Sequence, residues 1–419
     1  MIRHIFILLT AFMMSSLFNA YAEQMELRSK SLTTINGLPS NTVRHIWQDS
    51  KGFIWFGTTN GLCRYDGNTF LNFHAESSND AVLSLVDNKI NKLQEDNHGF
   101  LWIGTAIKRY CCYDLHQGKF VDFMGKETNN QELSRIQILP NNDVWLWDNE
   151  DGARLIIRNE KRELSSVAFT KEQGNLPDNH IRFIFQDQSG RVWIGTRKGL
   201  ALYNQGKSLI IDHEIDCFSI TEHGQEVYLS STNGYIHKLN TDGLAEMTMM
   251  PASLGKVKLT GTFPVKDKWN ILTNKGVFCF EFKTHTLFQH KTLRLNDGKV
   301  LIDNHKDYWV YNKSGYVYYI QSKTGKIKEF DFFPKEKVGF IDNERYRIIH
   351  TPDDIVWIST YGNGLFAYDI ATDKLEHFTA GKEKKQSSDF RLYFVYGTRQ
   401  NRRNMDKHGT CRTTTPNRN

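Results

Sequence analysis

The groups with which this sequence could do chemistry are its histidines and its acidic residues. Its 15 histidines are dispersed along 419 residues, and none forms an H-x-x-x-H pair in a helical setting, the spacing of many zinc sites. The histidines considered as ligands are His45, His98, His180, His223, His237, His285, His290, His305, His350 and His377. We therefore predict no metal site, no cofactor and no catalytic residues.

Three aspartates recur at one position of a repeated turn. Asp49, Asp96 and Asp187 open the sequences DSKG, DNHG and DQSG. An aspartate there can accept hydrogen bonds from its own turn, and the glycine can adopt the positive φ that such turns require. Because the aspartate recurs from copy to copy, we predict that it caps hairpins and takes no part in catalysis.

These turns belong to a segment that repeats along the chain. The strong copies are residues 38–70, 88–120, 176–204 and 344–378, and the weaker copies are 139–157, 222–239, 265–282 and 304–320. Their aromatic anchors are Trp55, Trp102, Trp145, Trp193, Tyr228, Trp269, Trp309 and Trp357, so that seven of the nine tryptophans fill one slot. The anchors follow one another at intervals of about 43 residues, the length of a four-stranded propeller blade. Although tryptophan can stack on sugars, an aromatic present in every copy is expected to fill the space between blades.

Each copy predicts four β-strands. The first strand ends at the aspartate turn, the second carries the anchor, and the third alternates, as at Cys63 and Tyr65. A fourth strand, such as residues 69–75, completes the sheet. The sequence therefore predicts an all-β fold, a β-propeller of four-stranded blades, with seven blades favoured and eight possible. Residues 25–32 resemble the fourth strand of a blade. Such a strand would complete the last blade, close the ring and leave no open sheet edge.

The two ends of the chain are expected to lie outside the propeller, which takes residues 23–380. Residues 1–22 have a basic start, a short apolar core and small residues near the end, which predicts a cleaved signal peptide and export to the periplasm. An uncleaved anchor is the alternative. The tail, residues 381–419, has lost the anchor, the alternation and the turn glycines together. We interpret it as a frameshifted or truncated start of a further blade, with a disordered basic tail as the alternative.

The distribution of charge and the spacing of the cysteines argue against nucleic-acid binding by the propeller and against a disulfide framework. Residues 382–419 hold ten Lys and Arg against three acidic residues, a charge of +7, so the rest of the chain carries about −1 of the formal net charge of +6. The propeller therefore gives no sign of nucleic-acid binding. The six cysteines show no paired spacing, and we expect them to act as small apolar side chains and not as disulfides.

The best candidates for ligand binding are polar residues at the start of the innermost strand in the strong copies. They are Asn41, Arg44, Asn88, Asn91, Asn179, Arg182, Glu344 and Arg347. Innermost strands line the central channel of a propeller, and amide and guanidinium groups suit the paired oxygen atoms of glycans. The alternative is that these groups cap the strand entries and bind water.

The segment LPSNTVRHIWQDSKGFIWFGTTNGLCRYDG, residues 38–67, resembles the two-component regulator propeller repeat. The resemblance covers roughly residues 25–380. It implies the periplasmic sensor region of a Bacteroides-type hybrid two-component regulator. In that family two seven-bladed propellers and an immunoglobulin-like domain precede a membrane helix, a histidine kinase and a receiver. Such proteins are expected to sense breakdown products of complex polysaccharides.

This resemblance implies a non-enzymatic, ligand-sensing propeller that takes an oligosaccharide, allows a homodimer and lacks the kinase output in this chain. Membrane attachment would come only through missing C-terminal parts, and no nucleic acid would bind. The alternative is an exported propeller enzyme, a lyase or hydrolase acting on polysaccharide, and a scaffold for protein partners is a third reading. Propellers host all of these roles, so the fold does not decide among them.

Overall fold

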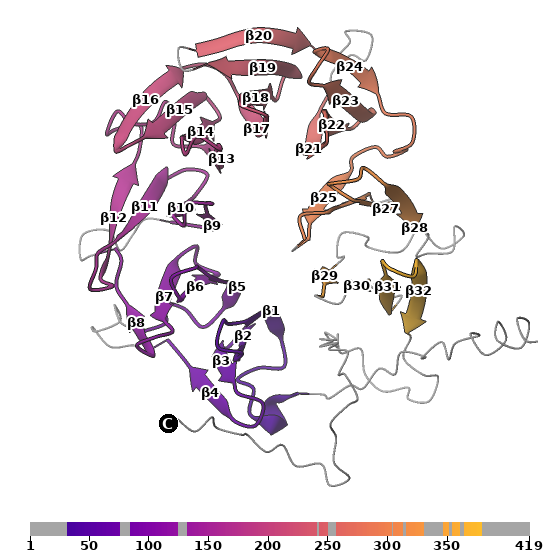
Figure 1. Ribbon diagram of the computed structural model, residues 1–419. Coiled ribbons are helices and arrows are strands. Elements are labelled where there is room, and N and C mark those ends of the chain that lie inside the picture. The colour runs from indigo at the N-terminus through magenta and orange to yellow at the C-terminus, as the bar shows by residue number, and fades with distance from the viewer. Residues whose placement is uncertain are drawn as a thin grey trace, which may run out of the picture. The chain divides into compact units, whose positions relative to one another are not determined.

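The computed structural model describes residues 32–75, 84–124, 132–240, 243–249, 257–303, 305–312, 316–330, 347–351, 354–360 and 364–378. These residues form eight four-stranded antiparallel sheets, set around a common centre as the blades of a propeller (Figure 1). The predicted all-β propeller is confirmed, and its blade number is eight, the alternative that the repeat spacing left open. All eight blades belong to the unit that begins at Thr33.

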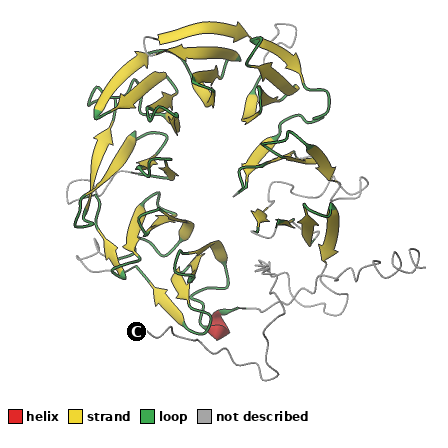
Figure 2. Ribbon diagram, in the orientation of Figure 1, coloured by secondary structure: helices red, strands yellow, loops and turns green. Residues whose placement is uncertain are grey.

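The helical content of the described ranges is one short 3-10 helix, η1 (Thr34–Asn36), and every other element there is a strand (Figure 2). Those ranges contain no helix that is long and apolar enough to cross a membrane. The predicted signal peptide, nearly all of the predicted closing strand and the basic tail lie outside the described residues.

The strands follow one another in chain order, four to a blade. Blades 1 to 3 contain β1 (Val43–Gln48), β2 (Ile54–Thr58), β3 (Gly61–Tyr65), β4 (Phe70–Phe73), β5 (Ile90–Glu95), β6 (Phe100–Thr105), β7 (Tyr110–Asp114), β8 (Lys119–Val121), β9 (Arg135–Ile138), β10 (Val144–Trp147), β11 (Ala153–Arg158) and β12 (Leu164–Phe169). Blades 4 to 6 contain β13 (Ile181–Gln186), β14 (Val192–Thr196), β15 (Gly199–Asn204), β16 (Lys207–Asp212), β17 (Cys217–His223), β18 (Glu226–Ser231), β19 (Tyr235–Asn240), β20 (Gly243–Met249), β21 (Leu259–Val265), β22 (Lys268–Thr273), β23 (Gly276–Glu281) and β24 (Thr286–Gln289). Blades 7 and 8 contain β25 (Lys299–Ile302), β26 (Tyr308–Tyr311), β27 (Val317–Ile320), β28 (Ile327–Phe330), β29 (Arg347–His350), β30 (Ile355–Ser359), β31 (Leu365–Asp369) and β32 (Lys374–Phe378).

The first strand of each blade lies nearest the centre and the fourth lies outermost (Figure 1). Because the strands run antiparallel, their turns alternate between the two ends of the ring. We call the end where the innermost strands begin the entry face, and it also carries the turns between second and third strands. The opposite end, which carries the hairpins between first and second strands, is the hairpin face.

A buried aspartate organises the first hairpin of four blades. In blade 2 the Asp96 Oδ1 atom accepts the backbone N–H groups of His98 (2.9 Å) and Phe100 (3.0 Å). Its Oδ2 atom accepts the indole N–H of Trp102 at 2.9 Å. The same indole bond joins Asp49 to Trp55, Asp187 to Trp193 and Asp303 to Trp309. The predicted turn cap is confirmed, and the turn also fixes the anchor six residues later.

The anchors are buried between neighbouring blades, as the repeat predicts. Trp55 is fully buried and packs with Ile103 and Tyr113 of blade 2, where the Trp55 and Tyr113 ring centroids are 5.2 Å apart. In the same way Trp102 packs towards blade 3 and Trp145 towards blade 4. The tryptophan positions therefore serve packing between blades and not an open surface.

The anchor assigned to the sixth copy is out of register by one residue. In blades 1, 2, 4 and 5 the anchor lies three residues before the residue that ends the second strand, as Trp193 does before Thr196. In blade 6 the corresponding residue before Thr273 is Asn270, so Asn270 fills the slot and Trp269 faces blade 5, where it packs with Tyr228. Blade 5 has the same two-residue hairpin, with His223 paired to Glu226, and keeps Tyr228 in the slot, so the offset arises because Trp269 lies one residue earlier in its strand. A shift of one residue in a strand moves a side chain to the opposite face.

Hydrogen bonds to backbone N–H groups join neighbouring blades on both faces of the ring. On the entry face, the turn glycine Gly61 donates its N–H to the carbonyl of Asn88 at 2.7 Å, and Gly199 donates to Ile215 at 2.7 Å. At Gly199 the φ angle is 118°, and an added Cβ would lie 2.3 Å from the Asp212 carbonyl oxygen. Only glycine meets both conditions.

On the hairpin face, a side chain near the end of the innermost strand reaches back to the preceding blade in blades 2, 4 and 5. Glu95 accepts the backbone N–H of Ser50 at 2.8 Å, and Gln186 accepts that of Asn141 at 2.9 Å. Glu222 accepts the N–H of Gln188 in the same manner. These side chains therefore tie blades 1 to 2, 3 to 4 and 4 to 5.

A buried ion pair adds a further tie between blades 2 and 3. Arg162 donates from Nε and Nη2 to the carboxylate of Asp114 at 2.9 and 3.0 Å, and Nη2 also donates to the His98 carbonyl at 3.0 Å. The Asp114 side chain is fully buried, and the Arg162 guanidinium lies over the Phe100 ring. Burial alone raises the pKa of Asp114, but the hydrogen bonds from Arg162 and from nearby backbone amides hold it below its usual value.

The cysteines of the described ranges are buried and free, as predicted. They are Cys63, Cys111, Cys112, Cys217 and Cys279. Burial raises the pKa of the Cys63, Cys111 and Cys217 thiols to about 12. These thiols are inert packing groups.

Replacing an anchor by phenylalanine separates packing from the indole bond. We expect Trp102→Phe to lower the free energy of unfolding by about 1–2 kcal/mol more than Trp145→Phe, because only Trp102 donates to a buried carboxylate. The Trp145 indole N–H has no such partner in the described structure. Urea unfolding of both variants measures the difference, and equal losses would contradict the assignment.

Removing the Arg162 guanidinium leaves the buried Asp114 carboxylate uncompensated. Arg162→Ala is expected to cost about 3 kcal/mol near pH 7, and Arg162→Lys less. Because the folded pKa of Asp114 is lowered, this contribution is present above about pH 4 and is lost as the pH falls through the folded pKa. Unfolding midpoints of wild type and Arg162→Ala should therefore converge on acidification, and a difference that stays constant with pH would argue against the ion pair.

Candidate functional site

Three of the predicted binding residues occupy one special position of the innermost strand. Arg44, Asn91 and Arg182 are the extra residues of β-bulges in β1, β5 and β13, where the pairing with the second strand shifts by one. All three are exposed. Bulges redirect side chains and are common beside binding sites. The sequence placed these residues at the channel but gave no sign of the bulge, because a bulge depends on pairing between strands.

The bulge residues contact neighbouring blades. Arg44 donates a hydrogen bond to the side chain of Asn91, which joins blades 1 and 2. Arg182 donates to Asp216 of blade 5 at 3.1 Å. The structure thus brings Arg44 and Asn91 together, and it pairs Arg182 with a residue that the sequence did not single out. Ligand binding by this group stays a prediction.

The three asparagines have a different environment. Asn41 accepts the backbone N–H of Thr34 at 2.8 Å, Asn88 that of Ala75 at 2.7 Å, and Asn179 that of Lys171 at 2.7 Å. These bonds hold the chain as it enters the innermost strand, which favours the capping alternative for the asparagines. Glu344 and the side chain of Arg347 lie outside the described residues.

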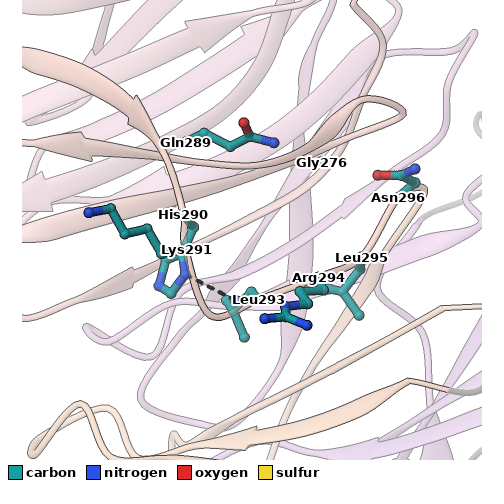
Figure 3. A pocket seen from close by; sticks show the side chains of 8 residues that line it. All are labelled: Gly276, Gln289, His290, Lys291, Leu293, Arg294, Leu295 and Asn296. Atoms are coloured by element: carbon teal, nitrogen blue, oxygen red, sulfur yellow. Dashed lines mark hydrogen bonds between the residues drawn. The ribbon is translucent and has the colours of Figure 1, made fainter.

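A pocket of about 650 Å³ opens on the entry face between blades 6 and 7. It is formed by the connection from β24 to β25 and by the turn that begins β23 (Figure 3). Its lining residues are Gly276, Gln289, His290, Lys291, Leu293, Arg294, Leu295 and Asn296. Leu293 and Leu295 are buried and anchor the connection, while Lys291 and Arg294 are exposed. Its volume falls within the range of small-molecule sites.

The pocket is positively charged. Neither Lys291 nor Arg294 forms an ion pair within the described part of the chain. The Nδ1 atom of His290 accepts the backbone N–H groups of Thr292 (3.2 Å) and Leu293 (3.1 Å), the second of which is drawn in Figure 3. That places the imidazole proton on Nε2. Burial, together with the nearby Lys268 ammonium, lowers the pKa of His290 below 6.5. The pocket therefore offers neutral and cationic donors to an anionic or hydroxyl-bearing ligand.

Sequence reasoning missed this pocket for an identifiable reason. Residues 289–296 lie between the sixth and seventh copies and follow no repeat pattern. The available signal was a basic segment, HKTLR, that no other copy shares. The structure also brings together His305 and His350, which are dispersed in the sequence, with ring centroids 3.7 Å apart.

Comparison with known families matches this chain to the two-component regulator propeller model at residues 37–60, 84–106 and 175–198. Three segments of the chain are thus similar to two-component regulator propeller repeats. They coincide with the aspartate turn and anchor of blades 1, 2 and 4, which confirms the resemblance seen in the sequence. A search among curated proteins gives no match.

Solved structures with a similar arrangement include two extracellular domains from B. thetaiotaomicron. The first, from a putative one-component system, is 18% identical over 80% of this chain and 52% of its own, with a TM-score of 0.40. The second, from a putative hybrid two-component system, is 19% identical over 85% of this chain and 61% of its own, with a TM-score of 0.27. This chain spans about half to three fifths of those proteins. Saccharomyces cerevisiae Sqt1 is 11% identical over 77% of this chain and 93% of its own, with a TM-score of 0.51, a likeness of fold alone.

The hydrogen bonds at His290 predict its titration. We expect a folded pKa below 6.5 with the proton on Nε2, and a rise in that pKa in Lys268→Met, which removes the neighbouring charge. Because the folded pKa is lowered, neutral His290 stabilises the fold fully above about pH 6.5, and this contribution is lost as the pH falls through the folded pKa. Nitrogen NMR of histidine-labelled protein gives both tautomer and pKa, and a pKa above 6.5 would disprove this account.

Proposed function

We propose that this chain is an exported, ligand-sensing propeller of a two-component regulator. The observation that carries the proposal is the match of three blade segments to the regulator propeller repeat. The four-stranded blades support it, because a repeat built for packing leaves recognition to turns and connections at the rim. The predicted signal peptide supports export to the periplasm, and the two bacterial structures above are described as extracellular domains.

We further propose that the ligand is an acidic oligosaccharide released from a complex polysaccharide. The pocket between blades 6 and 7 supports this class of ligand, since Lys291 and Arg294 present cationic donors that no carboxylate of the described chain satisfies. Gln289, Asn296 and the Nε2–H of His290 can bind hydroxyl groups. Carboxylate or sulfate groups on the sugar would meet the two cations.

The position of the pocket also bears on signalling. Gly276 and Gln289 belong to blade 6, whereas Leu295 and Asn296 lead into β25 of blade 7. A ligand that contacts both sides favours one relative placement of these two blades. In a homodimer such a preference would be passed to the kinase half of the regulator across the membrane.

Calorimetry with neutral and acidic oligosaccharides tests the proposal. We expect the acidic sugars to bind without being cleaved, and Lys291→Ala with Arg294→Ala to weaken binding at least tenfold, the effect of losing charge-assisted hydrogen bonds. Lys207→Ala, an exposed lysine on β16 of blade 4, is the matched control and should bind as wild type does.

The same samples separate the alternatives. Cleavage of the oligosaccharides, followed by the appearance of reducing or unsaturated ends, would favour an exported lyase or hydrolase and end the sensor proposal. Equal affinity in the double variant and in the wild type would show that the ligand does not bind in the pocket. The bulge residues Arg44 and Arg182 would then be the next to be substituted.

A further inference from the structure

Three potential metal ligands meet on the hairpin face where blade 7 adjoins blade 8. His305 lies in the turn between β25 and β26, His350 ends β29, and Asp354 lies in the turn between β29 and β30. One ligand atom from each lies within 4.8 Å of those of the other two. His350 is almost fully buried, while His305 and Asp354 are open to solvent.

The distances approach those of a tetrahedral metal centre. Metal–ligand bonds of about 2.0–2.1 Å at tetrahedral angles place neighbouring ligand atoms about 3.3–3.4 Å apart. His350 Nε2 and Asp354 Oδ1 are 3.4 Å apart, and His305 Nδ1 and Asp354 Oδ1 are 3.9 Å apart. A small rotation of the exposed His305 ring would complete the geometry without moving the backbone.

A buried carboxylate already orients the central ligand. The Nδ1 atom of His350 lies 3.3 Å from Asp303 Oδ2, and that aspartate is itself held by the Trp309 indole and by two turn amides. This arrangement directs Nε2 towards Asp354. Metal-binding histidines are commonly held in this way by a carboxylate, which fixes the ring and strengthens it as a donor.

The turn of blade 8 differs from those of blades 1, 2 and 4 at the position that supplies Asp354. The fourth residue of the aspartate turn is Gly52, Gly99 or Gly190 in the strong copies, and each has a positive φ. In blade 8 that residue is Asp354, which keeps the positive φ of 61° although it is not a glycine. Blades 3 and 7 also place a non-glycine residue with positive φ here, Asn142 (71°) and Lys306 (65°), so the conformation belongs to the turn and only the carboxylate is particular to blade 8.

The geometry points to a binding site for one divalent transition-metal ion, Zn²⁺ foremost, held by His305, His350 and Asp354. Two nitrogens and one carboxylate form a set that Zn²⁺ accepts, with water or an anion in the fourth position. The ion joins the first hairpins of blades 7 and 8. At the corresponding place between blades 1 and 2, the Glu95 side chain accepts the backbone N–H of Ser50. The metal site lies on the face opposite the ligand pocket and serves as a tie between blades.

Titration of the full chain, expressed without a polyhistidine tag and freed of metal by chelator, tests the site. We expect one equivalent of Zn²⁺ to bind by calorimetry and to raise the thermal unfolding midpoint, and Co²⁺ to give the visible absorption of a tetrahedral complex. His305→Gln and Asp354→Asn change exposed side chains, so the fold should persist, and each should weaken Zn²⁺ binding at least tenfold. His116→Gln, an exposed histidine in the turn between β7 and β8, is the matched control.

Circular dichroism of each variant establishes that it is folded before metal is added. Unaltered Zn²⁺ affinity in the folded His305→Gln and Asp354→Asn variants would overturn the site, as would the absence of saturable binding to wild type. Loss of binding in both variants, with the control unchanged, would support it. His350→Gln is informative only if folded, and should then abolish the cobalt absorption.

Discussion

The packing of four blades is organised by the bond between a buried aspartate and the indole of a tryptophan six residues later. A tryptophan buries roughly 150–250 Å², worth about 4–6 kcal/mol at 25 cal per Å². That gain requires the ring to point at the next blade, and the Asp96 carboxylate sets the direction while it closes its own hairpin. Three hydrogen bonds offset the cost of burying the charge. One residue therefore couples the turn, the strand and the contact between blades.

The blades without this aspartate show what the bond contributes. In blade 3 the turn position is Leu139, and in blade 8 it is Thr351, so the indole nitrogens of Trp145 and Trp357 have no such partner in the described structure. Blades 5 and 6 have two-residue hairpins in its place, and in blade 6 the tryptophan lies on the other face of the sheet. Packing between blades tolerates each change, because the burial of apolar surface has no direction and many side chains share it.

Candidate functional groups lie where the repeat is interrupted. Repeated positions are occupied by packing, by caps and by ties between blades, as Asn88 and Glu95 show. Residues that occur in only one copy have no such structural role and are free to bind ligands. Lys291 and Arg294 lie on a connection that no other blade shares, and Asp354 replaces a turn glycine. The residues of the proposed ligand pocket on the entry face, and those of the proposed metal site on the hairpin face, can therefore vary without disturbing the sheets.

The sequence alone determined the all-β class, the four-stranded repeat, the capping role of Asp49, Asp96 and Asp187, and the relation to regulator propellers, because these follow from local patterns of turn residues and alternation. It could not place Trp269, since the blade that a side chain faces depends on the register of its strand, and register is fixed only once the strands pair. It could not set eight blades above seven, because ring closure is a property of packing around an axis. The bulges at Arg44 and Arg182, the pocket of residues 289–296 and the meeting of His305 with His350 and Asp354 were decided by the tertiary structure, which joins blades that are distant in sequence.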